Sequence, residues 1–235
     1  MAYLAQALER RRGPNHFGAR LTAGSLALGA FLLAGIPIAY ILWPQPAPPT
    51  LDAPSLPITV GSVTFNVPPA SMRVPIQRRP GTQGRIDLVF LWPSLTPPDP
   101  AHKPTPATAP QVIDRVFVSI AASDGALPPA ERLKVVYPRY FAPGTPAGPT
   151  GLTARNFRAG TPYQGEDVMY DATAPERFLL RCTRQVGVTP GMCLHERRIG
   201  TADMTVRFPR DWLADWRAVA NGIDQLVASL RPSGA

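Results

Sequence analysis

An uncharged apolar run near the N-terminus constrains this chain more than any other feature. Residues 21–43 contain no charged side chain and are rich in Leu, Ile, Ala and Gly. As a helix this run is about 34 Å long, which exceeds the roughly 30 Å of a bilayer's hydrocarbon core. Its large aliphatic side chains favour insertion into that core. The sequence therefore predicts one transmembrane anchor over residues 21–43.

The same N-terminal pattern has two competing interpretations. A cleavable signal peptide has an apolar core of about 7 to 15 residues that ends at a small-x-small site. This run is longer, and it ends in Ile41, Leu42 and Trp43. A twin-arginine export signal would use the arginines at 10–12, but Gly13 follows them where that signal has an apolar pattern. We therefore expect an anchor that is not cleaved.

Basic residues gather on one side of the apolar run, with arginines at 10–12 and Arg20 before it and no Lys or Arg in residues 44–72. The positive side of a membrane segment stays in the cytoplasm. Residues 1–20 are therefore predicted to be a basic cytoplasmic tail. Everything beyond residue 43 is predicted to lie in the periplasm of a bacterium, on the outer side of the inner membrane, where nucleic acid is not a partner.

Small residues recur at four-residue spacing inside the predicted anchor. Such spacing lets two helices approach closely and indicates a helix partner, although Gly and Ala are abundant in anchors in any case. The residues concerned are Ala23, Ala27, Ser25, Gly29, Ala30 and Ala34.

Proline divides the outward part of the chain. The 235 residues include 30 Pro, too many for an all-helical bundle. Residues 44–57 are predicted to form a stiff, polyproline-like stalk that spans about 40 Å. A periplasmic domain is predicted over residues 58–232, and a second Pro-rich stretch, 97–110, is predicted to be a surface loop within it.

Hydrophobic periodicity predicts an α+β domain, an antiparallel sheet covered by a C-terminal amphipathic helix. The helix is predicted over Asp211–Leu230, where apolar residues recur at steps of three and four. Residues 85–95 alternate around a strongly apolar centre and are predicted to be a central strand. The other predicted elements are a hairpin at 58–67, strands at 112–121, 151–157, 166–171, 177–183, 192–199 and 204–208, and a short helix at 128–137.

The two cysteines, Cys182 and Cys193, lie in neighbouring predicted strands of a domain that faces an oxidising compartment. This arrangement favours a disulfide. A metal site that adds His195 and Glu196 is an alternative, but neighbouring strand residues face opposite sides and no Cys-x-x-Cys knuckle is present. Free thiols are the third interpretation. We predict the disulfide, no metal and no cofactor.

Catalytic motifs are not found in the sequence, and we predict no catalytic residue. The densest acidic cluster is Glu166, Asp167 and Asp171. Paired carboxylates can act on a glycan, but adjacent acids beside a Gly-containing turn are more often solvated or capping groups. An envelope enzyme that acts on a glycan or lipid is therefore the alternative function, and it requires a cleft that joins Glu166, Asp167 and His195.

Arginine is concentrated in the last third of the chain. Arg177 and Arg181 share one face of their predicted strand, and Arg207 joins them if it projects the same way two strands along. The predicted contact face is therefore Arg177, Arg181 and Arg207. Such a face suits an anionic lipid, an acidic glycan or an acidic envelope protein, and a solvated face without a function is the alternative.

Several segments together resemble a group of single-span bacterial envelope proteins whose outer domain faces the periplasm. The segments are RIDLVFLWPSL at 85–95, TGLTARNF at 150–157, the late cysteine pair and FPRDWLADWR at 208–217. The resemblance implies a fold and a location but no activity. The expected function is therefore a membrane-anchored, non-enzymatic binding or scaffolding module of the cell envelope.

Overall fold

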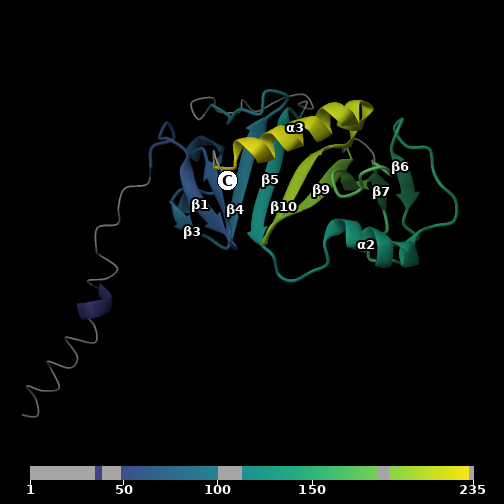
Figure 1. Cartoon of the computed structure of the whole chain (residues 1–235), viewed down its shortest axis with the longest axis horizontal. Coiled ribbons are helices and arrows are strands. Elements are labelled where there is room, and N and C mark those ends of the chain that lie inside the picture. Colours follow the sequence, from purple (N-terminus) through teal and green to yellow (C-terminus); the bar gives the residue numbers. More distant parts are fainter. Residues whose placement is uncertain (1–34, 39–48, 100–112, 185–190, 233–235) are drawn as a thin grey trace, which may run out of the picture. The chain divides into compact units, whose positions relative to one another are not determined.

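The computed structural model describes residues 35–38, 49–99, 113–184 and 191–232 (Figure 1). The chain divides into two compact units, Met1–Ala47 and Pro48–Ala235. Within the first unit, residues 35–38 are helical. None of the helices in the described ranges is long and apolar enough to cross a membrane. Apart from residues 35–38, the predicted anchor and its small-residue spacing lie outside those ranges, as does most of the Pro-rich loop.

A seven-stranded antiparallel sheet forms the centre of the second unit (Figure 1), in the order β4-β5-β10-β9-β8-β7-β6. Strands β6 to β10 lie in the sheet in the order in which they occur in the chain. Each of them therefore pairs with the strand that is next to it in the sequence. β10 then pairs with β5, which pairs with β4. The strands are β4 (Arg85–Leu91), β5 (Arg115–Ala122), β6 (Thr153–Asn156), β7 (Glu166–Tyr170), β8 (Leu179–Thr183), β9 (Met192–Ile199) and β10 (Ala202–Pro209).

The C-terminal helix α3 (Trp216–Ser229) lies across one face of this sheet (Figure 1). The α+β fold with a helix-covered antiparallel sheet is thus confirmed. The first turn differs from the prediction, because η4 (Arg210–Asp215) is a 3-10 helix and Asp215 caps α3 by accepting a hydrogen bond from the Ala218 amide at 3.2 Å. The helix and its C-cap bury an apolar stripe that consists of Trp216, Val219, Ala220, Ile223, Leu226 and Leu230.

A small second sheet joins the large one at two hairpin turns. It contains β1 (Leu56–Val60), β2 (Val63–Val67) and β3 (Gly81–Thr82), so the predicted hairpin is confirmed and the last two residues of the predicted stalk belong to a strand. Gly61 has φ +62°, and a Cβ there would lie 2.7 Å from the Thr201 carbonyl oxygen. Only glycine tolerates both conditions, so the turn between β1 and β2 can contact the turn between β9 and β10. The Ser62 amide donates a hydrogen bond to Thr201 Oγ1 at 2.7 Å.

A second, smaller core lies on the sheet face opposite α3. Val168 packs there with Tyr137 and Phe157, whereas its strand neighbour Met169 belongs to the main core. Helix α2 (Pro129–Val135) and the 3-10 helix η3 (Tyr137–Tyr140) supply the cover. They lie over the β7 end of the sheet. Over β4, β5 and β10, the same face carries no α-helix in the described part of the chain, although the 3-10 helices η1 (Pro69–Ser71) and η2 (Pro75–Gln77) lie beside β4.

The prediction that residues 85–95 form a central strand is wrong. β4 ends at Leu91 and lies at one edge of the large sheet. Its outer edge is nevertheless occupied, because the Arg73 amide donates to the Asp87 carbonyl and the Asp87 amide donates to Gln77 Oε1, both at 2.9 Å. A strand covered in this way has the apolar alternation of an inner strand, so its sequence does not reveal the edge position.

The predicted disulfide is present. Cys182 of β8 and Cys193 of β9 lie directly opposite each other in the register and are bonded, with an S–S distance of 2.02 Å. Both side chains are fully buried in the main core. Because the two sulfur atoms are bonded to each other, they are neither metal ligands nor free thiols.

We expect the double substitution Cys182→Ala/Cys193→Ala to lower the free energy of unfolding by about 3 kcal/mol, because the bridge closes a short loop in the unfolded chain. Urea denaturation measures this loss. Addition of a reductant should bring the unsubstituted protein to the stability of the double variant and should leave the double variant unchanged. A double variant as stable as the oxidised protein would contradict the prediction.

Candidate binding groove

The three arginines of the predicted contact face do not form one patch. Arg181 on β8 and Arg207 on β10 do share a sheet face, because both lie opposite Leu194 of the strand between them. Arg177 precedes β8, and its side chain is bound to α3. The structure therefore places two of the three residues, Arg181 and Arg207, on one sheet face. Those two side chains nevertheless have different surroundings.

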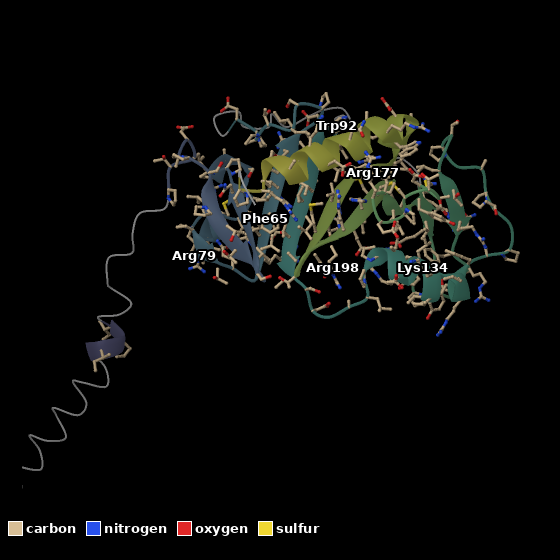
Figure 2. The ribbon with its side chains drawn as sticks, viewed as in Figure 1. Phe65, Arg79, Trp92, Lys134, Arg177 and Arg198 are labelled. Atoms are coloured by element: carbon tan, nitrogen blue, oxygen red, sulfur yellow. A yellow bond between two sulfur atoms is a disulfide. The ribbon has the colours of Figure 1, made fainter. Side chains whose placement is uncertain are left out.

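Arg177 helps to fix α3 on the sheet (Figure 2). Its Nε donates to Asp224 Oδ2 at 2.8 Å, and its Nη2 donates to Asn221 Oδ1 at 2.7 Å. Arg197 of β9 donates to the other oxygen of the same carboxylate at 2.6 Å. Burial pushes the pKa of Asp224 upward, but the two arginines outweigh it and hold the pKa below its ordinary value. Asp224 therefore stays ionised and links the helix to Arg197 of β9 and to Arg177, which precedes β8.

Arg181 is enclosed in the half of the sheet that α2 and η3 cover. Its Nη1 donates to Glu166 Oε2 at 2.9 Å, and its Nε lies 3.6 Å from Glu196 Oε2. The guanidinium also stacks over the Tyr163 ring, 5.4 Å from the centroid. With 17% of its side chain exposed, Arg181 is a neutralised structural cation and not an open contact.

Arg207 lies in a shallow cavity on the uncovered half of the sheet. It is exposed, and its side chain forms no hydrogen bond or ion pair with any residue that the structure describes. The cavity has a volume of about 540 Å³. We call it the open groove. Its lining includes Arg73, Arg85, Asp87, Phe117, Met192 and Arg207.

One of the three groove cations is neutralised locally. Arg85 Nη2 donates to Asp87 Oδ1 at 2.8 Å, and its Nε contacts both carboxylate oxygens. Burial alone would raise the pKa of Asp87, but hydrogen bonds from Arg85 and Gln77 outweigh it and lower the pKa. Asp87 is therefore ionised at neutral pH, and its charge offsets that of Arg85.

The other two groove cations flank one aromatic ring. The Arg73 guanidinium stacks over Phe117, 4.9 Å from the ring centroid. Phe117 of β5 pairs directly with Arg207 of β10. Neither Arg73 nor Arg207 has a carboxylate partner in the described ranges. The groove therefore has two uncompensated positive charges beside an apolar floor, and planar guanidinium groups bind carboxylates or phosphates through paired hydrogen bonds.

Sequence reasoning identified Arg207 but not the other groove residues. The signal for Arg85 and Phe117 was present, because each alternates with buried residues of its strand and must face away from α3. The pairing of β10 with β5, which brings these residues together, is a long-range contact that no local pattern encodes. Arg73 lies outside the strands and carried no signal.

The three residues required for the enzyme alternative do not line one cleft. Glu166 and Asp167 are neighbours on β7, so they face opposite sides of the sheet. Glu166 binds Arg181, whereas Asp167 is 5% exposed and binds Arg184 and Arg210 at 2.9 and 2.7 Å. His195 is fully buried. The geometry thus gives this alternative no support.

His195 is a neutral core residue. Its Nδ1 lies 3.1 Å from the Leu179 carbonyl oxygen, which can only accept, so Nδ1 carries the proton. The ring stacks on Phe178 with 5.6 Å between centroids. Burial lowers the pKa of His195 from 6.5 to about 4. The folded protein therefore resists protonation of this ring at pH values where the unfolded chain accepts a proton.

We expect His195 to destabilise the fold as the pH falls from 6.5 towards 4. The unfolded chain binds a proton in this window and the folded chain does not, which costs about 2 kcal/mol of unfolding free energy at pH 5. His195→Asn keeps a donor for Leu179 but cannot titrate. Urea denaturation at several pH values should show a smaller loss for this variant, and parallel pH curves would contradict the prediction.

No protein-family model and no curated protein matches the chain. Two solved structures are similar to it. An immunity protein of the Stenotrophomonas maltophilia type IV secretion system is 15% identical, with 77% of this chain and 94% of that chain covered and a TM-score of 0.53. The iron-regulated outer membrane lipoprotein FrpD of Neisseria meningitidis is 10% identical, with 79% and 96% covered and a TM-score of 0.41. The first similarity shows that the immunity protein and this chain share a fold.

Proposed function

We propose that this chain is a non-enzymatic binding module of the bacterial cell envelope. Residues 21–43 anchor it in the inner membrane, and its domain lies in the periplasm. Two observations support this placement: basic residues precede the uncharged run, and a buried disulfide joins Cys182 to Cys193. Disulfides persist in oxidising compartments such as the periplasm and are rare in the cytosol.

The open groove is the proposed binding surface. The observation that carries this proposal is the pair of exposed arginines, Arg73 and Arg207, that lack a carboxylate partner among the described residues. In the half of the sheet that α2 covers, by contrast, Arg132 of α2 and Arg181 of β8 both pair with acids. Unpaired charge beside an aromatic ring on an uncovered sheet face is typical of a contact surface. The fold shared with an immunity protein is compatible with such a binding role.

Reporter fusions test the location. A periplasm-dependent phosphatase fused after Pro232 should be active, and a fluorescent protein that matures only in the cytoplasm should be dark at the same site. After cell fractionation, the fusion protein should be recovered in the inner-membrane fraction. A fluorescent fusion, or a product released from the membrane, would overturn the placement.

Site-specific photo-crosslinking in whole cells tests the binding surface. Ile76 is 75% exposed and immediately precedes Gln77, which hydrogen-bonds to the groove residue Asp87. A crosslinker at Ile76 should therefore capture a discrete partner, whereas a crosslinker at the exposed Gln225 of α3 should not. Capture should also be lost when Arg207 is replaced by Glu. Equal capture from both positions, or capture from α3 alone, would overturn the proposal.

A further inference from the structure

We propose that the open groove binds an acidic segment of a partner protein, with carboxylates held by Arg73 and Arg207 on either side of the Phe117 ring. This inference rests on the proposed function and specifies the chemistry of its partner.

The spacing of the two cations suits more than one carboxylate. Phe117 and Arg207 are register partners on adjacent strands, which lie about 4.8 Å apart. Arg73 extends over the Phe117 ring from the segment that covers the outer edge of β4. The two guanidinium groups are therefore held by different elements on either side of one aromatic residue. Acidic residues on one extended or helical segment have a comparable separation of about 5 to 7 Å.

Both guanidinium groups are prepared for binding. The contact with the Phe117 ring restrains the Arg73 side chain, so less side-chain freedom is lost when a carboxylate binds. Arg207 projects from the middle of the large sheet, which fixes its backbone through pairs on both sides. Asp87 does not compete for either cation, because its carboxylate accepts hydrogen bonds from Arg85 and Gln77. An incoming acid therefore displaces no ion pair that Arg73 or Arg207 forms with the described residues.

The lining of the groove favours a polypeptide over a phosphate-bearing surface. Phe117 lies between the cations, and Met192 of β9 adds apolar area on the other side of Arg207; side-chain methylene groups can cover both. The groove is a concavity in a sheet face, whereas a bilayer surface is flat. An acidic protein segment satisfies both conditions.

A charge-matched pair of variants tests the inference. Arg73→Glu/Arg207→Glu reverses the two groove cations. Arg139→Glu/Arg231→Glu makes the same change in net charge at two exposed arginines whose side chains have no partner in the described ranges. All four positions are exposed, so both variants should keep the thermal stability of the unsubstituted protein. The full-length protein is used in nanodiscs of neutral lipid.

The direct readout is fluorescence anisotropy with a labelled ten-residue peptide of alternating Glu and Leu. The unsubstituted protein and the control variant should bind it alike, with affinity that falls as salt rises. The groove variant should bind about 100-fold more weakly, because two charge-assisted contacts are replaced by repulsion. Unchanged peptide binding by the groove variant, or an equal loss in the control variant, would overturn the inference.

Competition separates the acidic segment from other anions. Unlabelled peptide should displace the probe, whereas inorganic phosphate and vesicles of anionic phospholipid at equal charge concentration should not. Displacement by phosphate or vesicles as effectively as by peptide would overturn the acidic-segment inference. If the groove variant loses the crosslinks from Ile76 but still binds the peptide as the unsubstituted protein does, the inference fails while the proposed binding surface stands. If Ile76 captures nothing although the peptide binds, the proposed function fails on its own.

Discussion

The Leu226→Asp variant should fail to fold. Leu226 lies on the buried stripe of α3 and is 1% exposed, so aspartate at this position would place an unpaired carboxylate in the main core. The loss of leucine packing and the cost of the buried charge together amount to about 5 kcal/mol or more. Small domains have a net stability of about 5 to 15 kcal/mol, so this single substitution removes most or all of it. Circular dichroism and urea denaturation would measure the loss.

The control is the next residue towards the N-terminus. Gln225 is exposed on the same helix, so Gln225→Asp introduces the same charge without burying it. This variant should keep its urea midpoint within the range of ordinary surface substitutions, about 0.5 kcal/mol. A folded Leu226→Asp protein, or equal losses in the two variants, would show that α3 does not hold the sheet together.

Elements whose periodicity is local could be predicted from the sequence. The strand at 192–199 has the bounds of β9, and the apolar steps of three and four identify the buried stripe of α3. The disulfide followed from the position of Cys182 and Cys193 on neighbouring strands. In each case the pattern repeats within one element or between two elements that are consecutive along the chain.

Features that depend on distant contacts could not be predicted. β4 has the composition of an inner strand because Arg73 and Gln77 cover its outer edge with hydrogen bonds. The sequence predicts a strand that begins at Arg177, but β8 begins at Leu179. The Arg177 side chain instead binds Asp224 of α3, 47 positions away in the sequence. Because of this long-range ion pair, Arg177 does not belong to the predicted contact face. Strand alternation within one segment could not reveal the ion pair.

The same limit applies to the candidate site. Alternation correctly placed Arg181 and Arg207 on one sheet face, yet it gave no information on which part of that face α2 covers. Cover by α2 makes Arg181 part of a buried ion network, and its absence over the described β5 and β10 leaves Arg207 exposed. Two arginines that look equivalent in the sequence therefore have separable roles, which substitution can measure.

We expect Arg181→Ala to lower the free energy of unfolding by about 3 to 5 kcal/mol. The substitution leaves the Glu166 carboxylate, about one-fifth exposed, without its cation, whereas Glu196 keeps its ion pair with Arg132. It also removes the guanidinium from the Tyr163 ring. Arg207→Ala should leave stability within about 0.5 kcal/mol, because Arg207 has no described partner to lose. Urea denaturation of both variants measures the contrast.

A second substitution separates lost charge pairing from lost packing. Glu166→Gln removes one of the two carboxylates that Arg181 neutralises, so in the Arg181→Ala background it should restore part of the stability. In the unsubstituted protein the same change should be destabilising, because it weakens the existing pair. The sign of the Glu166→Gln effect thus depends on the presence of the arginine. If it does not, Arg181 stabilises the α2 half of the sheet by packing alone, and its charge contributes nothing to the fold.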